Sequence, residues 1–179
     1  MRQVDVTIDD RWFLPIPGDG DLGAWARESA DRLLSQPSHE DDPAAVESAL
    51  LGFAELADPT AVANLLFCPD GLPGRAIVMV YASQTDAKDL AEIVDEAPAA
   101  LPRRVLPFRD QDAATARIVS TVRQIPDGVL GILQFQQLRD GALVETVVAT
   151  PSLRDLGAGI ELFEELTARV SIGADEHGQ

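Results

Sequence analysis

Cysteine, histidine and lysine are almost missing from this sequence of 179 residues. Cys68 is the single cysteine, so the chain can form no internal disulfide and can assemble no cysteine-based zinc site. A nucleophilic role for Cys68 needs a histidine partner, and the two histidines, His39 and His177, lie in an expected loop and in the polar tail. We therefore interpret Cys68 as a buried, inert thiol.

Long hydrophobic runs are also missing. No stretch approaches the roughly 20 apolar residues that a membrane span requires, and the N-terminal residues lack the apolar core of a signal peptide. Internal repeats, low-complexity tracts and long linkers are missing too. The sequence predicts a soluble cytoplasmic protein, with a single α+β domain over residues 1–172 and a disordered tail over 173–179. The excess of arginine and alanine over lysine favours a bacterial source with a GC-rich genome.

Basic charge is scarce. There are 14 Lys and Arg residues against 30 Asp and Glu residues, which gives a net charge of −16 and a pI near 4.3. The electric field of this negative charge repels phosphate backbones and anionic lipid headgroups, so we expect neither a nucleic acid nor a membrane partner. A basic protein partner, or simple solubility, remains as the explanation of the acidic charge.

The clearest pattern that is present begins near residue 115. Residues 117–125, 129–138 and 143–150 read as three consecutive strands, and Asp140-Gly141 is a strong hairpin signal between the last two. Ser152 and Asp155 then have the form of a capping box before one long amphipathic helix. Its expected apolar stripe consists of Leu153, Leu156, Ile160, Phe163 and Leu166.

The first hundred residues give shorter signals. Helices are predicted from the caps Asp21 and Asp42, and a third from a capping box at Ser83 and Asp86. Strands are expected at residues 4–8, 12–16, 62–68, 76–82 and 105–108. Strand follows strand more often than strands alternate with helices. We therefore predict an α+β fold with a largely antiparallel sheet and helices packed on it. A parallel crossover within residues 76–108 is the alternative.

The order of these elements, ending in ATPSLRDLGAGIELFEELTARVSI (residues 149–172), resembles the PsbP-like α/β/α sandwich superfamily. In those proteins a final strand runs into a C-terminal helix that crosses the sheet. The resemblance implies an accessory or binding role, as in photosystem assembly factors, a nuclear-import release factor that binds a small GTPase, and bacterial lipoproteins. This chain lacks the signal sequence and lipidated cysteine of the lipoprotein members.

One glycine-rich stretch imitates a cofactor motif. Residues 18–23, GDGDLG, satisfy G-x-G-x-x-G and precede an expected helix. The preceding strand carries two prolines, and Asp19 and Asp21 would place carboxylates beside a pyrophosphate, so we interpret the stretch as a turn with an N-cap. The same residues fail the calcium-loop pattern, and Asp9 and Asp10 complete an acidic surface rather than a metal site. We expect no cofactor and no metal.

Two surfaces are candidates for recognition. Gln134 and Gln136 share one face of the middle strand with Ile132, where they form a solvated polar row or line a shallow groove. Glu40, Asp41 and Asp42 concentrate the acidic charge. Arg103, Arg104 and Arg109 form the only basic cluster, which we expect to pair with acids of the chain itself. The alternative is pairing with a carboxylate-bearing partner or a phosphate.

No catalytic constellation is visible. The sequence therefore predicts a small acidic accessory protein, non-catalytic, that binds another protein through its sheet or its acidic face. A sharper form of this hypothesis is an immunity- or chaperone-like protein that neutralises a basic cargo. The alternative is an enzyme or small-molecule-binding protein whose pocket is invisible to motifs.

Overall fold

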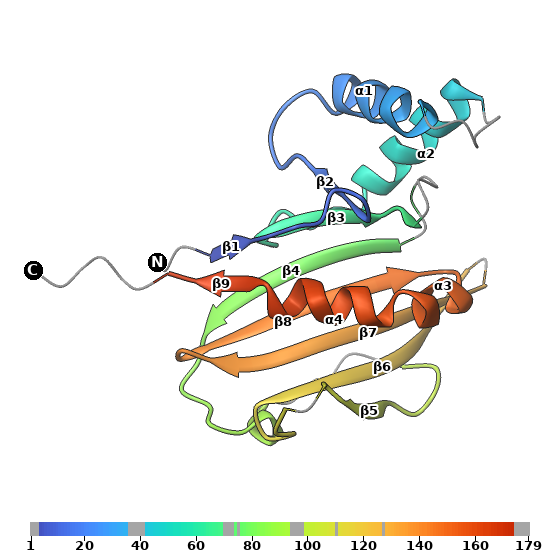
Figure 1. Cartoon of the computed structure of the whole chain (residues 1–179). Coiled ribbons are helices and arrows are strands. Elements are labelled where there is room, and N and C mark those ends of the chain that lie inside the picture. Colours follow the sequence, from blue (N-terminus) through green and yellow to red (C-terminus); the bar gives the residue numbers. More distant parts are fainter. Residues whose placement is uncertain are drawn as a thin grey trace, which may run out of the picture.

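The computed structural model describes residues 4–35, 42–69, 74, 76–93, 99–109, 111–126 and 128–173. Its centre is a seven-stranded sheet in the order β2-β3-β4-β8-β7-β6-β5 (Figure 1). Every neighbouring pair is antiparallel, which confirms the predicted α+β fold with an antiparallel sheet. Its strands are β2 (Phe13–Ile16), β3 (Ala63–Phe67), β4 (Ala76–Gln84), β5 (Arg104–Pro107), β6 (Ala116–Ile125), β7 (Gly128–Arg139) and β8 (Ala142–Thr150).

The predicted meander is confirmed as β6, β7 and β8. The turn between β7 and β8 has positive φ at both Asp140 (52°) and Gly141 (71°), the backbone of a tight hairpin turn. β2 contains Pro15 and is followed by Pro17. It lies at the edge of the sheet, where a backbone N–H group is not needed on the outer side.

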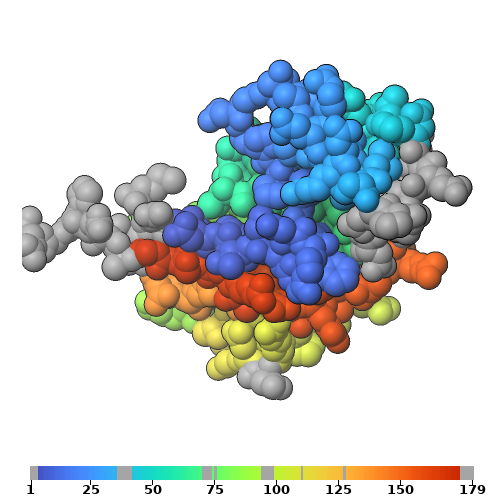
Figure 2. Space-filling model, turned by 45° about the horizontal axis from the view of Figure 1, so that its top comes forward, coloured from blue at the N-terminus to red at the C-terminus, as the bar shows by residue number. Residues whose placement is uncertain are grey.

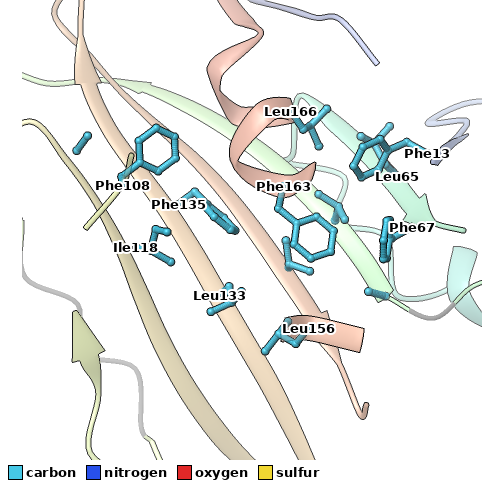
Figure 3. Close-up of a cluster of buried hydrophobic side chains, with 14 residues drawn as sticks. Phe13, Leu65, Phe67, Phe108, Ile118, Leu133, Phe135, Leu156, Phe163 and Leu166 are labelled. Carbon is cyan, nitrogen blue, oxygen red and sulfur yellow. The ribbon is translucent and has the colours of Figure 1, made fainter. Parts of the chain in front are cut away.

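One face of the sheet is covered by α3 (Leu153–Ala158) and α4 (Ile160–Ala168). Phe163 is fully buried in this layer. Figure 3 shows its ring between Phe135 on one side and Phe13 and Phe67 on the other. The ring centroids of Phe163 and Phe67 are 4.8 Å apart in an edge-to-face arrangement. These four rings belong to the main core, and we call them the aromatic core: Phe13, Phe67, Phe135 and Phe163.

The opposite face is covered at its β2–β3 end by α1 (Leu22–Leu34) and α2 (Pro43–Ala54) (Figure 1). Both helices begin at their predicted caps, because the Asp21 carboxylate accepts hydrogen bonds from two backbone N–H groups and that of Asp42 accepts one. Leu50 and Ala26 are completely buried between the helices and the sheet. The sheet thus lies between two helical layers, as in an α/β sandwich.

A second, two-stranded sheet joins the ends of the described chain. β1 (Val4–Val6) pairs antiparallel with β9 (Val170–Ile172). Figure 2 shows the N-terminal segment, in blue, lying along the C-terminal segment, in red. The sequence predicts a strand that contains β1, but it predicts no strand at residues 170–172, where β9 forms.

Two helix predictions are wrong. The helix expected after Ser83 does not form: β4 continues to Gln84, and the capping box belongs to Asp89 and Glu92 of a 3-10 helix, η2 (Leu90–Glu92). The single long helix expected after Ser152 is divided into α3 and α4 at Gly159. None of the helices in the described part of the chain is long and apolar enough to cross a membrane.

Candidate functional site

Gln136 belongs to a polar row that crosses the sheet on the face of α1 and α2. Arg117, Gln136 and Glu145 are register partners on β6, β7 and β8. The Arg117 Nε–H donates to Gln136 Oε1 (2.7 Å), and the Gln136 amide donates to Glu145 Oε1 (2.6 Å). Gln136 is only 1% exposed, so its amide is used inside the molecule and the expected solvated surface is wrong at this position.

Gln134 is half-buried one row further along the same face. Its register partners are Val119 and Val147. Gln134 and Gln136 therefore do share a face, and Ile132 lies on it in the core under α1 and α2. Gln134 thus lies between two valines, and Gln136 is buried. The structure therefore does not bring the two glutamines together as a binding surface.

The polar row continues on β4, where Tyr81 is the register partner of Glu145. The Tyr81 hydroxyl donates to Asp58 Oδ2 (2.9 Å). Asp58 also accepts from the backbone N–H (2.8 Å) and the hydroxyl (2.7 Å) of Thr60. The bonds from Thr60 and then from Tyr81 hold the pKa of Asp58 below its ordinary value. Burial, and then the bond to Asp58, raises the pKa of Tyr81 to about 12.

This pKa can be measured directly because Tyr81 is the only tyrosine. We expect ultraviolet titration of the folded protein to give one phenol transition near pH 12, against about 10 in urea. As the pH rises, the folded state keeps the Tyr81 proton that the unfolded state releases. The contribution of this proton to the free energy of unfolding is therefore fully present below about pH 10 and is lost as the pH rises toward 12. Asp58→Asn lowers the folded midpoint, but burial keeps it above that of the unfolded chain. A folded midpoint equal to the one in urea contradicts the arrangement.

The acidic candidates are only partly described. Glu40 and Asp41 lie outside the described residues. The carboxylate of Asp42 accepts from the Ala44 N–H (3.1 Å) and caps α2, so it has a structural role. Of the other acids, Asp9 pairs with Arg11 (2.6 Å), and within the described ranges no cluster of histidine, cysteine and acids has the form of a metal site.

The glycine-rich stretch is a turn and a cap. The strand before it, β2, is a short edge strand rather than a buried central one. The Asp21 carboxylate occupies the N–H groups of Gly23 (2.9 Å) and Ala24 (3.1 Å), where a pyrophosphate would have to bind. The arrangement is that of an N-capped helix.

The remaining candidates are interior or paired. Cys68 is buried, and burial raises the pKa of its thiol, as expected of an inert cysteine. His39 and His177 lie outside the described residues. The Arg109 Nε is 3.8 Å from Glu164 Oε2, so this member of the basic cluster does pair within the chain.

A groove of about 480 Å³ lies over β6, on the face of α3 and α4. We call it the α3–β6 groove. One wall is formed by α3 and the start of α4, and the other by the segment that leads into β5. Its described lining is Leu101, Pro102, Arg104, Ser120, Thr121, Val122, Leu133, Leu153, Leu156, Gly157 and Ile160.

The floor of the groove follows from strand register. Arg104 on β5 pairs with Ser120 on β6, which pairs with Leu133 on β7. Side chains at paired positions lie on one face of a sheet, so these three form a row from the outer strand inward. The row is polar at the outer strand and apolar at β7, where Leu156 of α3 also lines the groove.

Two glycines set the position and depth of the groove. A Cβ at Gly131, on β7, would lie 2.4 Å from Leu153 Cδ2 and 3.0 Å from Leu156 Cδ2, so α3 lies directly over a position without a side chain. At Gly157, on α3, a Cβ would meet no atom within 4 Å. Gly157 therefore faces the open space of the groove.

No motif in the sequence predicts this site. Its residues come from β5, β6, β7, α3 and α4 and form no motif. Leu153 was assigned to the buried stripe of the last helix, whereas its side chain is 49% exposed at the groove. Leu101, at 57% exposed, is the other large exposed apolar side chain of the described lining, and neither exposure can be predicted without the fold.

The chain matches no protein-family model and no curated protein. It is similar to the solution structure of cyanobacterial PsbP (CyanoP) from Synechocystis sp. PCC 6803, over 65% of this chain and 76% of that one, with 13% sequence identity and a TM-score of 0.39. The similarity is to the same PsbP-like group that the sequence resembles. It concerns the fold alone and carries nothing about ligands or partners.

Proposed function

We propose that this chain is a non-catalytic binding protein and that the α3–β6 groove holds an apolar ligand. The observation that carries the proposal is the groove itself. Its volume, about 480 Å³, lies in the usual range for ligand sites, roughly 300–1,000 Å³. Such sites are lined mainly by apolar side chains with a few polar groups that fix orientation, and this lining has that composition.

The lining also supports a role without catalysis. Among the described residues that line the groove there is no carboxylate, imidazole or thiol. Ser120 therefore has no neighbour in the groove that can accept its proton, which nucleophilic catalysis requires. Apolar burial is the main interaction that this surface can offer, and it favours binding of a molecule or segment that is itself apolar.

Filling the groove tests the proposal. Gly157→Phe places a ring in the groove without a clash at its Cβ. We expect the wild type to bind the neutral fluorescent probe N-phenyl-1-naphthylamine with a saturable rise in fluorescence, and the variant to lose about tenfold or more in affinity. The matched control is Gly52→Phe on α2, where a Cβ likewise meets no atom and binding should be unchanged. Equal loss in both variants, or no binding by the wild type, refutes the proposal.

A protein partner is the second candidate, favoured by the apolar surface beyond the groove. Val105 and Leu106 on the edge strand β5 are 63% and 36% exposed. Val105 pairs with Val119, and the next residue, Ser120, faces the groove. Because successive residues of a strand point to opposite faces of a sheet, Val105 points away from the groove. Val105→Lys should therefore weaken a protein partner that wraps around this edge and leave the probe affinity unchanged.

A further inference from the structure

Arg104 is the only charged side chain among the described residues that line the α3–β6 groove. No described carboxylate forms an ion pair with it, although the chain carries 30 acids. Arg104 is an exposed arginine at the edge of an apolar groove, and no acid of the described residues pairs with it, so its guanidinium can bind an anion. Its planar guanidinium is suited to a carboxylate, which it can bind through two parallel hydrogen bonds.

The local charge differs from that of the whole chain. Residues 99–126, which contain β5 and β6, have five arginines and two aspartates, whereas the net charge of the chain is −16. The outer strands therefore carry a positive local charge on a strongly negative protein. Charged ligands are guided by local fields as well as by direct contacts. Of these arginines, Arg104 lines the groove, whereas Arg109 pairs with Glu164, so the positive charge at the groove is that of Arg104.

The geometry separates the polar end of the groove from its apolar end. Arg104 and Ser120 are directly paired across β5 and β6, and directly paired side chains have Cβ atoms about 4.5–5.5 Å apart. The Ser120 hydroxyl can therefore donate a hydrogen bond to the same anion. The row then continues to Leu133, with Leu156 and Ile160 beside it in the lining.

From this arrangement we infer that the ligand of the groove is an amphiphilic carboxylic acid. Its carboxylate binds the Arg104 guanidinium and the Ser120 hydroxyl at β5, and its apolar chain lies along Leu133 toward α3. This inference rests on the proposed function and adds the chemical class of the ligand. It assigns Arg104 as the residue that selects an anion over a neutral molecule of the same length.

The test compares dodecanoate with 1-dodecanol as competitors of the naphthylamine probe at pH 8, below the critical micelle concentration. We expect the wild type to prefer dodecanoate. Arg104→Gln should weaken the binding of dodecanoate by about tenfold, which corresponds to about 1.4 kcal/mol. The affinity for dodecanol should stay unchanged within about twofold. The preference should also decrease as salt rises, because exposed charges are screened.

The matched control is Arg123→Gln. Arg123 is an exposed arginine of β6 that pairs with Leu130 and points to the face opposite the groove. Arg123→Gln removes the same charge from the neighbouring strand. A general field effect therefore lowers dodecanoate binding in both variants, whereas direct contact lowers it only in Arg104→Gln.

The outcomes separate the two proposals. Equal affinity for the acid and the alcohol in the wild type refutes the carboxylate inference and leaves the apolar groove in place. A loss of both ligands in Arg104→Gln also refutes it, because the residue is then structural. If neither competitor displaces the probe from a site that Gly157→Phe closes, the groove takes another apolar ligand and the inference is wrong. Failure of the probe itself to bind overturns the proposed function.

Discussion

Phe163→Ala is expected to lower the free energy of unfolding by about 3–5 kcal/mol, the usual effect of removing a buried aromatic ring. Phe163 is completely buried. Its ring centroid lies 4.8 Å from that of Phe67 and 6.3 Å from those of Phe13 and Phe135. These partners come from three different strands, so truncation opens a cavity that no single side chain can fill. Chemical denaturation followed by tryptophan fluorescence gives the midpoint and the slope.

The control for this substitution is Leu153→Ala. Both residues belong to the apolar stripe predicted from the sequence, but Leu153 is 49% exposed. We expect its truncation to cost less than about 1 kcal/mol, because half of its surface already contacts water. A midpoint of Phe163→Ala close to that of Leu153→Ala would mean that α4 does not cover the core.

Local signals were sufficient for most of the sheet and for the first two helices. The Asp140-Gly141 turn needs positive φ at both residues, and this requirement fixes the register of β7 and β8. The caps at Asp21 and Asp42 act on N–H groups two and three residues away. Such interactions depend on neighbours in the sequence, so the sequence alone predicts them.

Errors arose where tertiary contacts decide the outcome. Alternation predicts the face on which Gln136 lies, but it cannot show that Arg117 and Glu145 occupy the paired positions on both neighbouring strands. An amide flanked by two charged partners becomes an interior group, whereas the same amide beside valines, as at Gln134, remains half-buried. The difference is set by strand register, which pattern reading does not supply across three strands.

The groove was invisible for the same reason. Arg104 was grouped with Arg103 and Arg109 because they are close in sequence. In the fold, Arg109 pairs with Glu164 of α4, while Arg104 pairs in register with Ser120 and lines the groove. Charge in the sequence therefore indicates a basic cluster, but only Arg104 lies in β5, and Arg109 follows the end of this strand in a different environment.

The division of the last helix at Gly159 leads to the second large effect. Gly159 has φ of −92° and ψ of −2°, values that alanine can adopt. A Cβ at this position would lie 2.6 Å from Phe163 Cζ and 3.1 Å from Phe67 Cε1. The break thus occurs where the chain passes against the aromatic core, and the glycine is required by packing rather than by its backbone conformation.

Gly159→Ala is therefore expected to lower the free energy of unfolding by about 1–3 kcal/mol, the usual cost of overpacking a core. The two rings in contact belong to Phe163 and Phe67, which are enclosed on all sides and cannot swing into solvent. Higher helix propensity of alanine opposes this effect by at most about 1 kcal/mol. Urea denaturation and the near-ultraviolet circular dichroism of the aromatic core report the change.

Gly157→Ala provides the matched control, two residues away in α3. A Cβ there meets no atom within 4 Å, so only helix propensity acts and we expect stabilisation of up to about 1 kcal/mol. The same substitution should thus have opposite signs at two neighbouring glycines. If Gly159→Ala is neutral or stabilising, the ring of Phe163 has room to move, and the close packing of α4 against β3 and β7 is wrong.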